Sequence, residues 1–141
     1  MTESEIRHWA AEGFEFGSHT RTHASLPQAS QAELIKEVVN SRDELQTLTG
    51  LPVLSFAYPF GFWNESVVNV MRGTYHAVLS TEQGFNTLTT DPHLLRRVSI
   101  SAIDGIMSLK FQLITGKRLG YFLPERLKSL DSIRRLANQL P

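Results

Sequence analysis

Hydrophobic and polar positions switch between helical and strand-like spacing along the chain. Apolar residues at helical spacing predict a long helix from about Gln31 to Leu48 and a shorter one from Glu65 to about Arg72. Short apolar runs bounded by turn residues predict strands, and these runs are Phe14–Gly17, Val53–Ala57, Ala77–Ser80 and Leu95–Ile100. Strands that alternate with helices favour an α/β fold with parallel pairing.

The helix ends carry recognisable signals. Thr2 is followed three residues later by Glu5, and Ser30 by Glu33, which is the pattern of a capping box at a helix start. The residues from 103 to 140 are expected to form a mostly helical extension. Breaks in it are expected near Gly116, Gly120 and Pro124. We expect residues 1–141 to form a single domain.

Composition narrows the class of protein. Lys and Arg together number 14 and Asp and Glu number 14, so the formal net charge is zero, which argues against a nucleic-acid binder. Cysteine is absent, so any metal must be bound by His, Asp or Glu. No apolar run approaches the ~20 residues of a membrane span, and the sequence as written shows no signal peptide. The sequence does not decide the cellular compartment. We expect the cytoplasm for the chain as written, and export if the natural start lies upstream.

Polar residues follow two of the predicted strands. His19 and His23 come after Phe14–Gly17, and the turn Tyr58–Gly61 follows Val53–Ala57. Since parallel strands place their carboxyl ends at one edge, the two loops are expected to meet there. Two imidazoles four residues apart can bind one divalent ion. Taken alone, such a pair is more often two surface histidines, and Tyr58–Gly61 alone is more often a tight turn.

Longer strings around these residues resemble motifs of the polysaccharide deacetylase family. The string EFGSHTRTHASL, residues 15–26, resembles the family's second motif, and SFAYPFGFWN, residues 55–64, resembles its third. A weaker match is LLRRVSI, residues 94–100. The resemblance covers about residues 6–100 and implies a distorted (β/α) barrel.

The resemblance also implies roles for individual residues. His19 and His23 would be ligands of the catalytic divalent metal, with zinc the expected ion. The backbone N–H of Phe60 would help to form the oxyanion hole. Arg97 would orient the catalytic carboxylate, in place of the arginine that the family has where Ala57 stands here. Substrate would be bound by Tyr58, Pro59 and Trp63.

The chain also departs from the family pattern. The first motif, a strand ending in Thr-Phe-Asp-Asp, is absent, and with it the general base and the third metal ligand. We therefore expect the barrel to lack its first strand or strands. Asp91 and Asp104 are the nearest candidates for a substitute ligand. The family's last motif, Leu-x-His, is also missing, and His93 is a remote candidate for the acid.

Three functions follow from this resemblance. The first is a metal-dependent hydrolase that removes N-acetyl groups from an N-acetylhexosamine polysaccharide. The second is an inactive carbohydrate-binding or assembly module that uses the aromatic rings of Tyr58, Phe60, Phe62 and Trp63. The third is a structural domain that needs no metal. An incomplete barrel would leave bare strand edges, so we expect a homo-oligomer formed through them.

Overall fold

The computed structural model describes residues 1–100 and 105–116 of the 141-residue chain. The chain divides into two compact units. The first comprises residues 1–82 and 86–96, and the second comprises residues 83–85 and 97–141. His19 and His23 lie in the first unit. The predicted single domain over residues 1–141 stays a prediction.

The described residues form five α-helices and three strands, and one α-helix separates the first two strands, as the hydrophobic pattern predicts. The helices are α1 (Glu3–Ala11), α2 (Gln31–Leu34), α3 (Ser41–Thr49), α4 (Glu65–Arg72) and α5 (Ile106–Thr115). The strands are β1 (Ser55–Ala57), β2 (Ala77–Gln83) and β3 (Leu95–Arg97). Short 3₁₀ segments occur at Leu26–Gln28 and Pro59–Gly61.

A small sheet with strand order β1-β2-β3 lies at the centre of this arrangement. β1 pairs with β2 in parallel, with Ser55 opposite Ala77 and Ala57 opposite Leu79. The parallel pair and the helix between its two strands confirm the predicted α/β class.

The predicted strand Phe14–Gly17 is wrong. In its place the structure has a single parallel bridge between Ser18 and Phe56. The Ser18 N–H donates to Ser55 O at 2.9 Å, and the Ala57 N–H donates to Ser18 O at 3.0 Å. Among the described residues, this segment pairs only with β1 and only at this one bridge, so it does not form a ladder.

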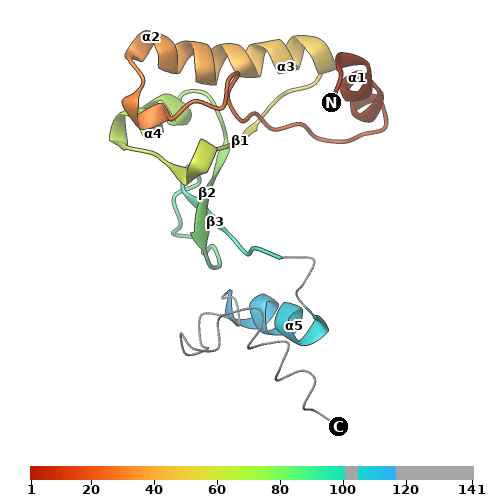
Figure 1. Cartoon of the computed structure of the whole chain (residues 1–141), viewed down its shortest axis with the longest axis vertical. Helices are drawn as coiled ribbons and strands as arrows, with labels where there is room; N and C mark the ends of the chain where they lie inside the picture. The colour runs from red at the N-terminus through yellow and green to blue at the C-terminus, as the bar shows by residue number, and fades with distance from the viewer. Residues whose placement is uncertain (101–104, 117–141) are drawn as a thin grey trace, which may run out of the picture. The chain divides into compact units, whose positions relative to one another are not determined.

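The long predicted helix is one rod made of three parts. α2 continues into a π-helical segment, Ile35–Asn40, and then into α3, and Figure 1 shows α2 and α3 in line. The rod ends at Gly50, whose φ of 71° is the left-handed conformation typical of a helix C-terminus. Apolar positions at helical spacing predict one continuous α-helix here and do not indicate the π segment.

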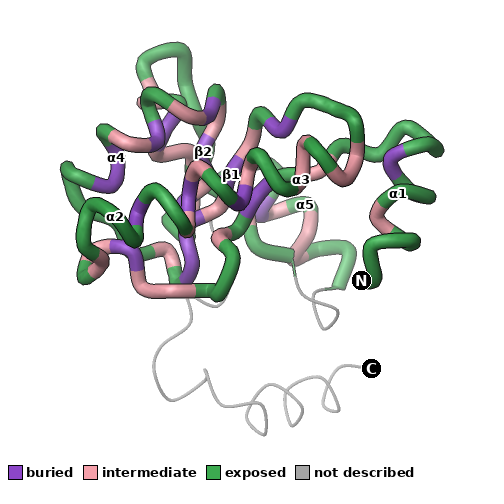
Figure 2. Tube along the Cα trace, turned by 90° about the horizontal axis from the view of Figure 1, so that it is seen from above, coloured by how far each residue is buried: buried purple, intermediate pink, exposed green. Residues whose placement is uncertain are grey.

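The hydrophobic core forms where the rod and α4 cover the strands. Figure 2 shows buried positions along β1 and β2 and on α4. Phe56 of β1 stacks against Tyr75 with ring centroids 5.1 Å apart. The other buried members of this cluster are Leu26, Leu34, Val38, Val53, Tyr58, Val67, Met71 and Val78.

Most element boundaries agree with the sequence prediction to within a few residues. Both capping boxes are present: the side chains of Thr2 and Ser30 accept the N–H of Glu5 and Glu33 respectively. α5 ends at Gly116, as predicted. The predicted breaks at Gly120 and Pro124 lie outside the described residues. Among the helices that the structure describes, none is both long and apolar enough to cross a membrane.

Candidate metal centre

His19 is held in place by its contact with the end of β1. It directly follows Ser18, which is bridged to β1. Its Nδ1 lies 2.7 Å from the carbonyl oxygen of Ala57, the last residue of β1. A carbonyl oxygen can only accept, so Nδ1 carries the proton and Nε2 keeps its lone pair. An imidazole oriented in this way through its other nitrogen is typical of metal-binding histidines.

His23 lies beside His19. The two ring centroids are 4.8 Å apart and the rings meet edge to face. The intervening loop is tightly bent, because Thr20 and His23 both have left-handed φ values, 66° and 60°. Left-handed backbone costs a non-glycine residue roughly 1–2 kcal/mol. The Thr20 hydroxyl offsets part of this cost by accepting the His23 N–H at 2.9 Å.

The turn after β1 completes this edge of the structure. Phe60 has φ 58°, and its ring centroid lies 4.5 Å from that of His23. The hydrogen bonds of the turn are made by its neighbours, Gly61 N–H to Tyr58 O and Phe62 N–H to Pro59 O. Among the described residues, the Phe60 N–H has no acceptor. The turn therefore has a backbone donor without an acceptor among the described residues, at the residue whose ring contacts His23.

Gly61 is required by the geometry of the turn. Its φ is 76°, and a Cβ added there would lie only 1.9 Å from Thr81 Oγ1. Because β2 passes so close to the turn, only glycine fits at this position.

The expected substrate-binding residues are only partly at the surface. Tyr58 and Pro59 are buried, and the Tyr58 hydroxyl donates to His93 O at 3.0 Å. Burial raises the pKa of Tyr58, so its phenol stays protonated. In this structure neither side chain reaches the surface beside the histidines. The exposed rings are those of Phe60 and Phe62, each 56% exposed, and Trp63, 36% exposed.

Arg97 is the last residue of β3 and belongs to the second unit. Its carbonyl oxygen accepts the Gly84 N–H at 3.3 Å within that unit. Its expected role beside a catalytic carboxylate therefore remains a prediction.

Buried His93 and half-buried Asp91 form a structural pair. The N–H of His93 donates to Asp91 Oδ1 at 2.9 Å, and His93 Nε2 lies 3.1 Å from Tyr75 O. Asp91 also pairs with Arg72 at 2.5 Å. The pKa of Asp91 is lowered, chiefly by the backbone hydrogen bond from His93; burial opposes this, and the Arg72 guanidinium and the His93 side chain lower the pKa further. Both residues are thus engaged in packing contacts, and Asp104 lies outside the described residues.

Sequence reasoning missed the residues that hold the histidine loop. Glu37, on the rod, accepts hydrogen bonds from Arg21 and Thr22. Ser41, also on the rod, contacts Ser18 through a hydroxyl–hydroxyl bond of 2.8 Å. Both positions belong to a helix whose sequence indicates only its apolar side, so no local signal identifies them.

The donor set fits a divalent ion only in part. Two neighbouring imidazoles suit zinc, which usually takes three protein ligands at a catalytic site. In the described part of the chain no third His, Asp or Glu joins them to make a metal-binding group. The third ligand expected from the resemblance is therefore absent from the described residues.

The sequence and the fold of this chain are similar to those of known proteins. A family model described as polysaccharide deacetylase matches residues 1–78. A polysaccharide deacetylase of Bacillus cereus, BC0361, superposes with a TM-score of 0.74 at 29% identity, over 80% of this chain and 36% of that one. The Streptococcus pyogenes deacetylase PplD, solved in complex with acetate, superposes with a TM-score of 0.72 at 25% identity, over 83% and 51%.

A curated relative named gellan lyase, from a Bacillus species, is 30% identical over 108 residues. That match covers 76% of this chain but 4% of the relative, and the chain spans about a third to a half of the two solved structures. The family model covers more than half of the chain, and the two structures share its fold over the matched parts. The chain belongs to the polysaccharide deacetylase family.

Proposed function

We propose that this chain carries the metal-binding half of a hydrolase that removes N-acetyl groups from an N-acetylhexosamine polysaccharide. The observation that carries the proposal is the histidine pair. His19 is fixed in one tautomer by Ala57 O, and His23 lies beside it. A pair of surface histidines would need no such fixed orientation.

The proposed ion is divalent, with zinc expected, and His19 and His23 would bind it. When bound, such an ion polarises a carbonyl group and lowers the pKa of water. The third ligand must come from outside the described residues. Without a positioned general base, hydrolysis is expected to be slower by about 10²–10⁴-fold. The experiment must therefore decide whether this chain alone can hydrolyse the substrate.

The backbone N–H of Phe60 is the proposed oxyanion donor. It lacks an acceptor among the described residues and belongs to a turn whose aromatic ring contacts His23. A donor held by the backbone serves the developing charge without reorganisation. Arg97 is proposed to orient the catalytic carboxylate.

The proposed assembly is a homo-oligomer formed through a strand edge. Ser18 directs its N–H and C=O toward β1. Its neighbours Gly17 and His19 therefore direct theirs to the opposite side, where the described residues offer no backbone partner. Such an edge can pair with a second chain. Sedimentation analysis that gave a monomer at high concentration would contradict this.

A second function is favoured by the exposed rings. Phe60 and Phe62 lie with ring centroids 5.8 Å apart, and both are more than half exposed. Exposed aromatic faces can bind sugar rings without a metal, so a carbohydrate-binding module remains the alternative.

Zinc stoichiometry and acetate release from N-acetylglucosamine oligomers test both functions. We expect the parent chain to retain zinc, and the double variant His19→Ala, His23→Ala to lose it. His76→Ala is the matched control, since His76 is exposed and bonds through its backbone N–H to Leu54 O. Oligomer binding without zinc or acetate release would favour the module instead. Unchanged folding of the double variant, with no sugar binding by either protein, would favour a structural domain.

A further inference from the structure

The loop between the two histidines is attached to the rod at its centre. The Glu37 carboxylate accepts the N–H of Arg21 at 2.9 Å and the N–H of Thr22 at 3.0 Å, both on Oε2. Its other oxygen, Oε1, accepts the Thr22 hydroxyl at 2.9 Å. Two successive backbone N–H groups thus donate to one anionic oxygen. This attachment is strong, because charge-assisted hydrogen bonds are stronger than neutral ones.

The start of the loop is attached to the same part of the rod. The Ser41 hydroxyl donates to the carbonyl oxygens of Glu37 and Val38, at 2.7 and 3.0 Å. Its single proton is used there, so in the 2.8 Å contact Ser18 Oγ donates to Ser41 Oγ. Ser18 and Ser41 are both buried. The residues on either side of His19 are thus held by one stretch of helix.

Glu37 lies in the π-helical segment Ile35–Asn40. A π segment turns the following side chains relative to those before it, and such segments often occur at functional sites. Here Leu34 and Val38 stay in the core while Glu37 faces the loop. Glu37 therefore anchors the loop from an irregular segment of the rod.

We infer that Glu37 is a positioning residue for the metal centre, which holds the His19–His23 loop in its bent form so that both imidazoles are in place before an ion binds. Without it, the loop would be free to leave the left-handed conformations of Thr20 and His23. Glu37 is not itself a ligand here, because both of its oxygens are occupied by the loop. This inference rests on the proposed metal site.

Three variants separate this role from general stability. Glu37→Ala removes the anchor, and Glu37→Gln keeps one acceptor oxygen for the two N–H groups. Glu44→Gln removes the other carboxylate at this loop, which contacts the exposed side chain of Arg21 rather than the backbone. Glu33→Ala removes the capping box of the same rod without touching the loop.

The first readout is zinc affinity, measured by competition with a chelator. We expect Glu37→Ala to bind zinc about 10–100-fold more weakly than the parent. Glu37→Gln should lie in between, and Glu44→Gln and Glu33→Ala should stay near the parent. Parental affinity in Glu37→Ala, or an equal loss in Glu33→Ala, would overturn the inference.

The second readout needs no metal. In the zinc-free protein, nuclear Overhauser effects between the His19 and His23 rings report their proximity, and amide exchange reports the Arg21 and Thr22 N–H groups. In Glu37→Ala we expect the ring-to-ring effects and the protection of the two amides from exchange to be lost. In Glu33→Ala we expect both to be kept. If the parent bound no zinc, the proposed function would fail while this measurement still decided the role of Glu37. Ring proximity preserved in Glu37→Ala would refute the positioning role.

Discussion

The Nδ1 atom of His19 lies 2.7 Å from the carbonyl oxygen of Ala57, 38 residues further along the chain. This contact joins the loop of one predicted motif to the strand of the next. The carbonyl belongs to the last residue of β1, which is itself fixed by its parallel pairing with β2. The sheet therefore decides which imidazole nitrogen is available to a ligand.

His19 should accordingly be a single tautomer. In the zinc-free protein, at a pH where the imidazoles are neutral, we expect the proton on Nδ1 and a bare Nε2. Nitrogen-15 chemical shifts of the ring distinguish the two tautomers directly. His76, exposed and bonded only through its backbone N–H in the contacts described, supplies the comparison. A His19 ring protonated mainly on Nε2 would contradict the structure.

The buried hydroxyl pair of Ser18 and Ser41 should be strongly coupled. Ser41→Ala leaves Ser18 Oγ buried without its partner, which typically costs about 1–3 kcal/mol of unfolding free energy. Ser18→Ala removes the donor in turn, and the double variant removes both groups. We expect the double variant to be less destabilised than the sum of the single variants, as measured by urea unfolding. Additive effects would mean that the two hydroxyls do not interact.

Gly61 offers a test of how closely β2 restricts the turn. Gly61→Ala places a Cβ against Thr81 and also imposes a left-handed φ on alanine. Gly13→Ala imposes a similar φ, since Gly13 has φ 88°, but meets no atom within 4 Å. We expect Gly13→Ala to cost about 1 kcal/mol and Gly61→Ala clearly more, because only the second adds a steric clash. Equal losses in thermal or urea unfolding would show that the turn can move away from Thr81.

Asp91 should make part of the stability depend on pH. Hydrogen bonds from His93 and Arg72 lower the pKa of Asp91 in the folded protein. The stabilisation is therefore complete above the unfolded value of about 3.9 and is lost as the pH falls through the folded pKa. We expect Asp91→Asn to be less stable than the parent at neutral pH, and this difference to shrink in acid. Unfolding measurements can be made down to roughly pH 2–3. A stability difference between Asp91→Asn and the parent that stayed constant from pH 6 down to this limit would contradict the prediction.

The sequence predicts the local features of this molecule better than its long-range contacts. The capping boxes at Thr2 and Ser30 depend on residues three positions apart, and both are present. The histidine pair could be singled out because its surrounding motif is local too. The strand expected before it is wrong, because strand formation depends on neighbours that lie far away in the chain.

The supports of the candidate site show the same limit. Glu37 contacts Arg21 and Thr22 across 15 or 16 residues, and Ser41 contacts Ser18 across 23. Neither residue differs in type from the other polar residues of the rod, so hydrophobic periodicity treats them as solvated. The π segment in which Glu37 lies is not indicated by that periodicity either.

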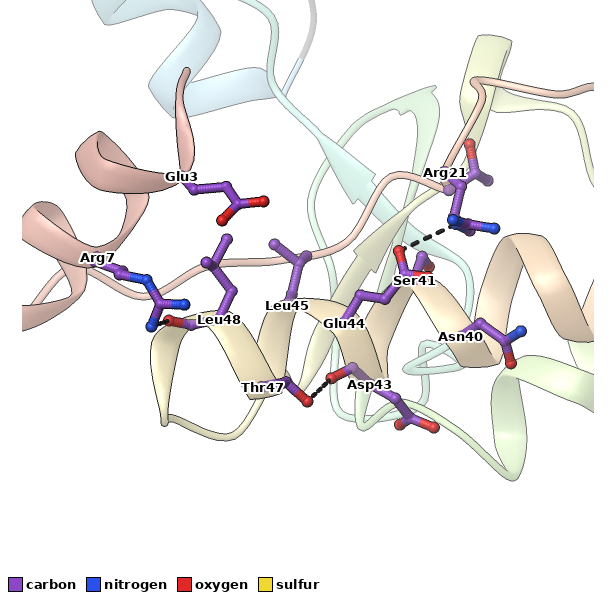
Figure 3. Close-up of a pocket in the computed structure, with 11 residues that line it drawn as sticks. Glu3, Arg7, Arg21, Asn40, Ser41, Asp43, Glu44, Leu45, Thr47 and Leu48 are labelled. Carbon is purple, nitrogen blue, oxygen red and sulfur yellow. Dashed lines mark hydrogen bonds and ion pairs between the residues drawn. The ribbon is translucent and has the colours of Figure 1, made fainter.

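A hollow beside this loop shows why chemistry, rather than size, points to the site. It has a volume of about 900 Å³ and lies between α1, the loop and α3 (Figure 3). Its walls are tied together by Arg7, which donates to Leu48 O at 2.8 Å, and by the pair of Arg21 and Glu44 at 3.0 Å. Neither histidine lines it. The candidate centre is instead an open edge of the structure.

Phe60 allows the two proposed functions to be separated at one residue. Phe60→Ala and Phe60→Gly both remove the exposed ring and keep the backbone N–H, but only glycine accepts φ 58° without cost. We expect the glycine variant to be more stable than the alanine variant by about 1 kcal/mol. If the ring binds sugar, both variants should lose affinity for N-acetylglucosamine oligomers in calorimetric titrations. Retained affinity in both would argue against ring stacking and leave the backbone N–H as the contribution of Phe60. Phe14→Ala is the matched control, since Phe14 is 57% exposed and its ring contacts Trp9 rather than the histidine loop.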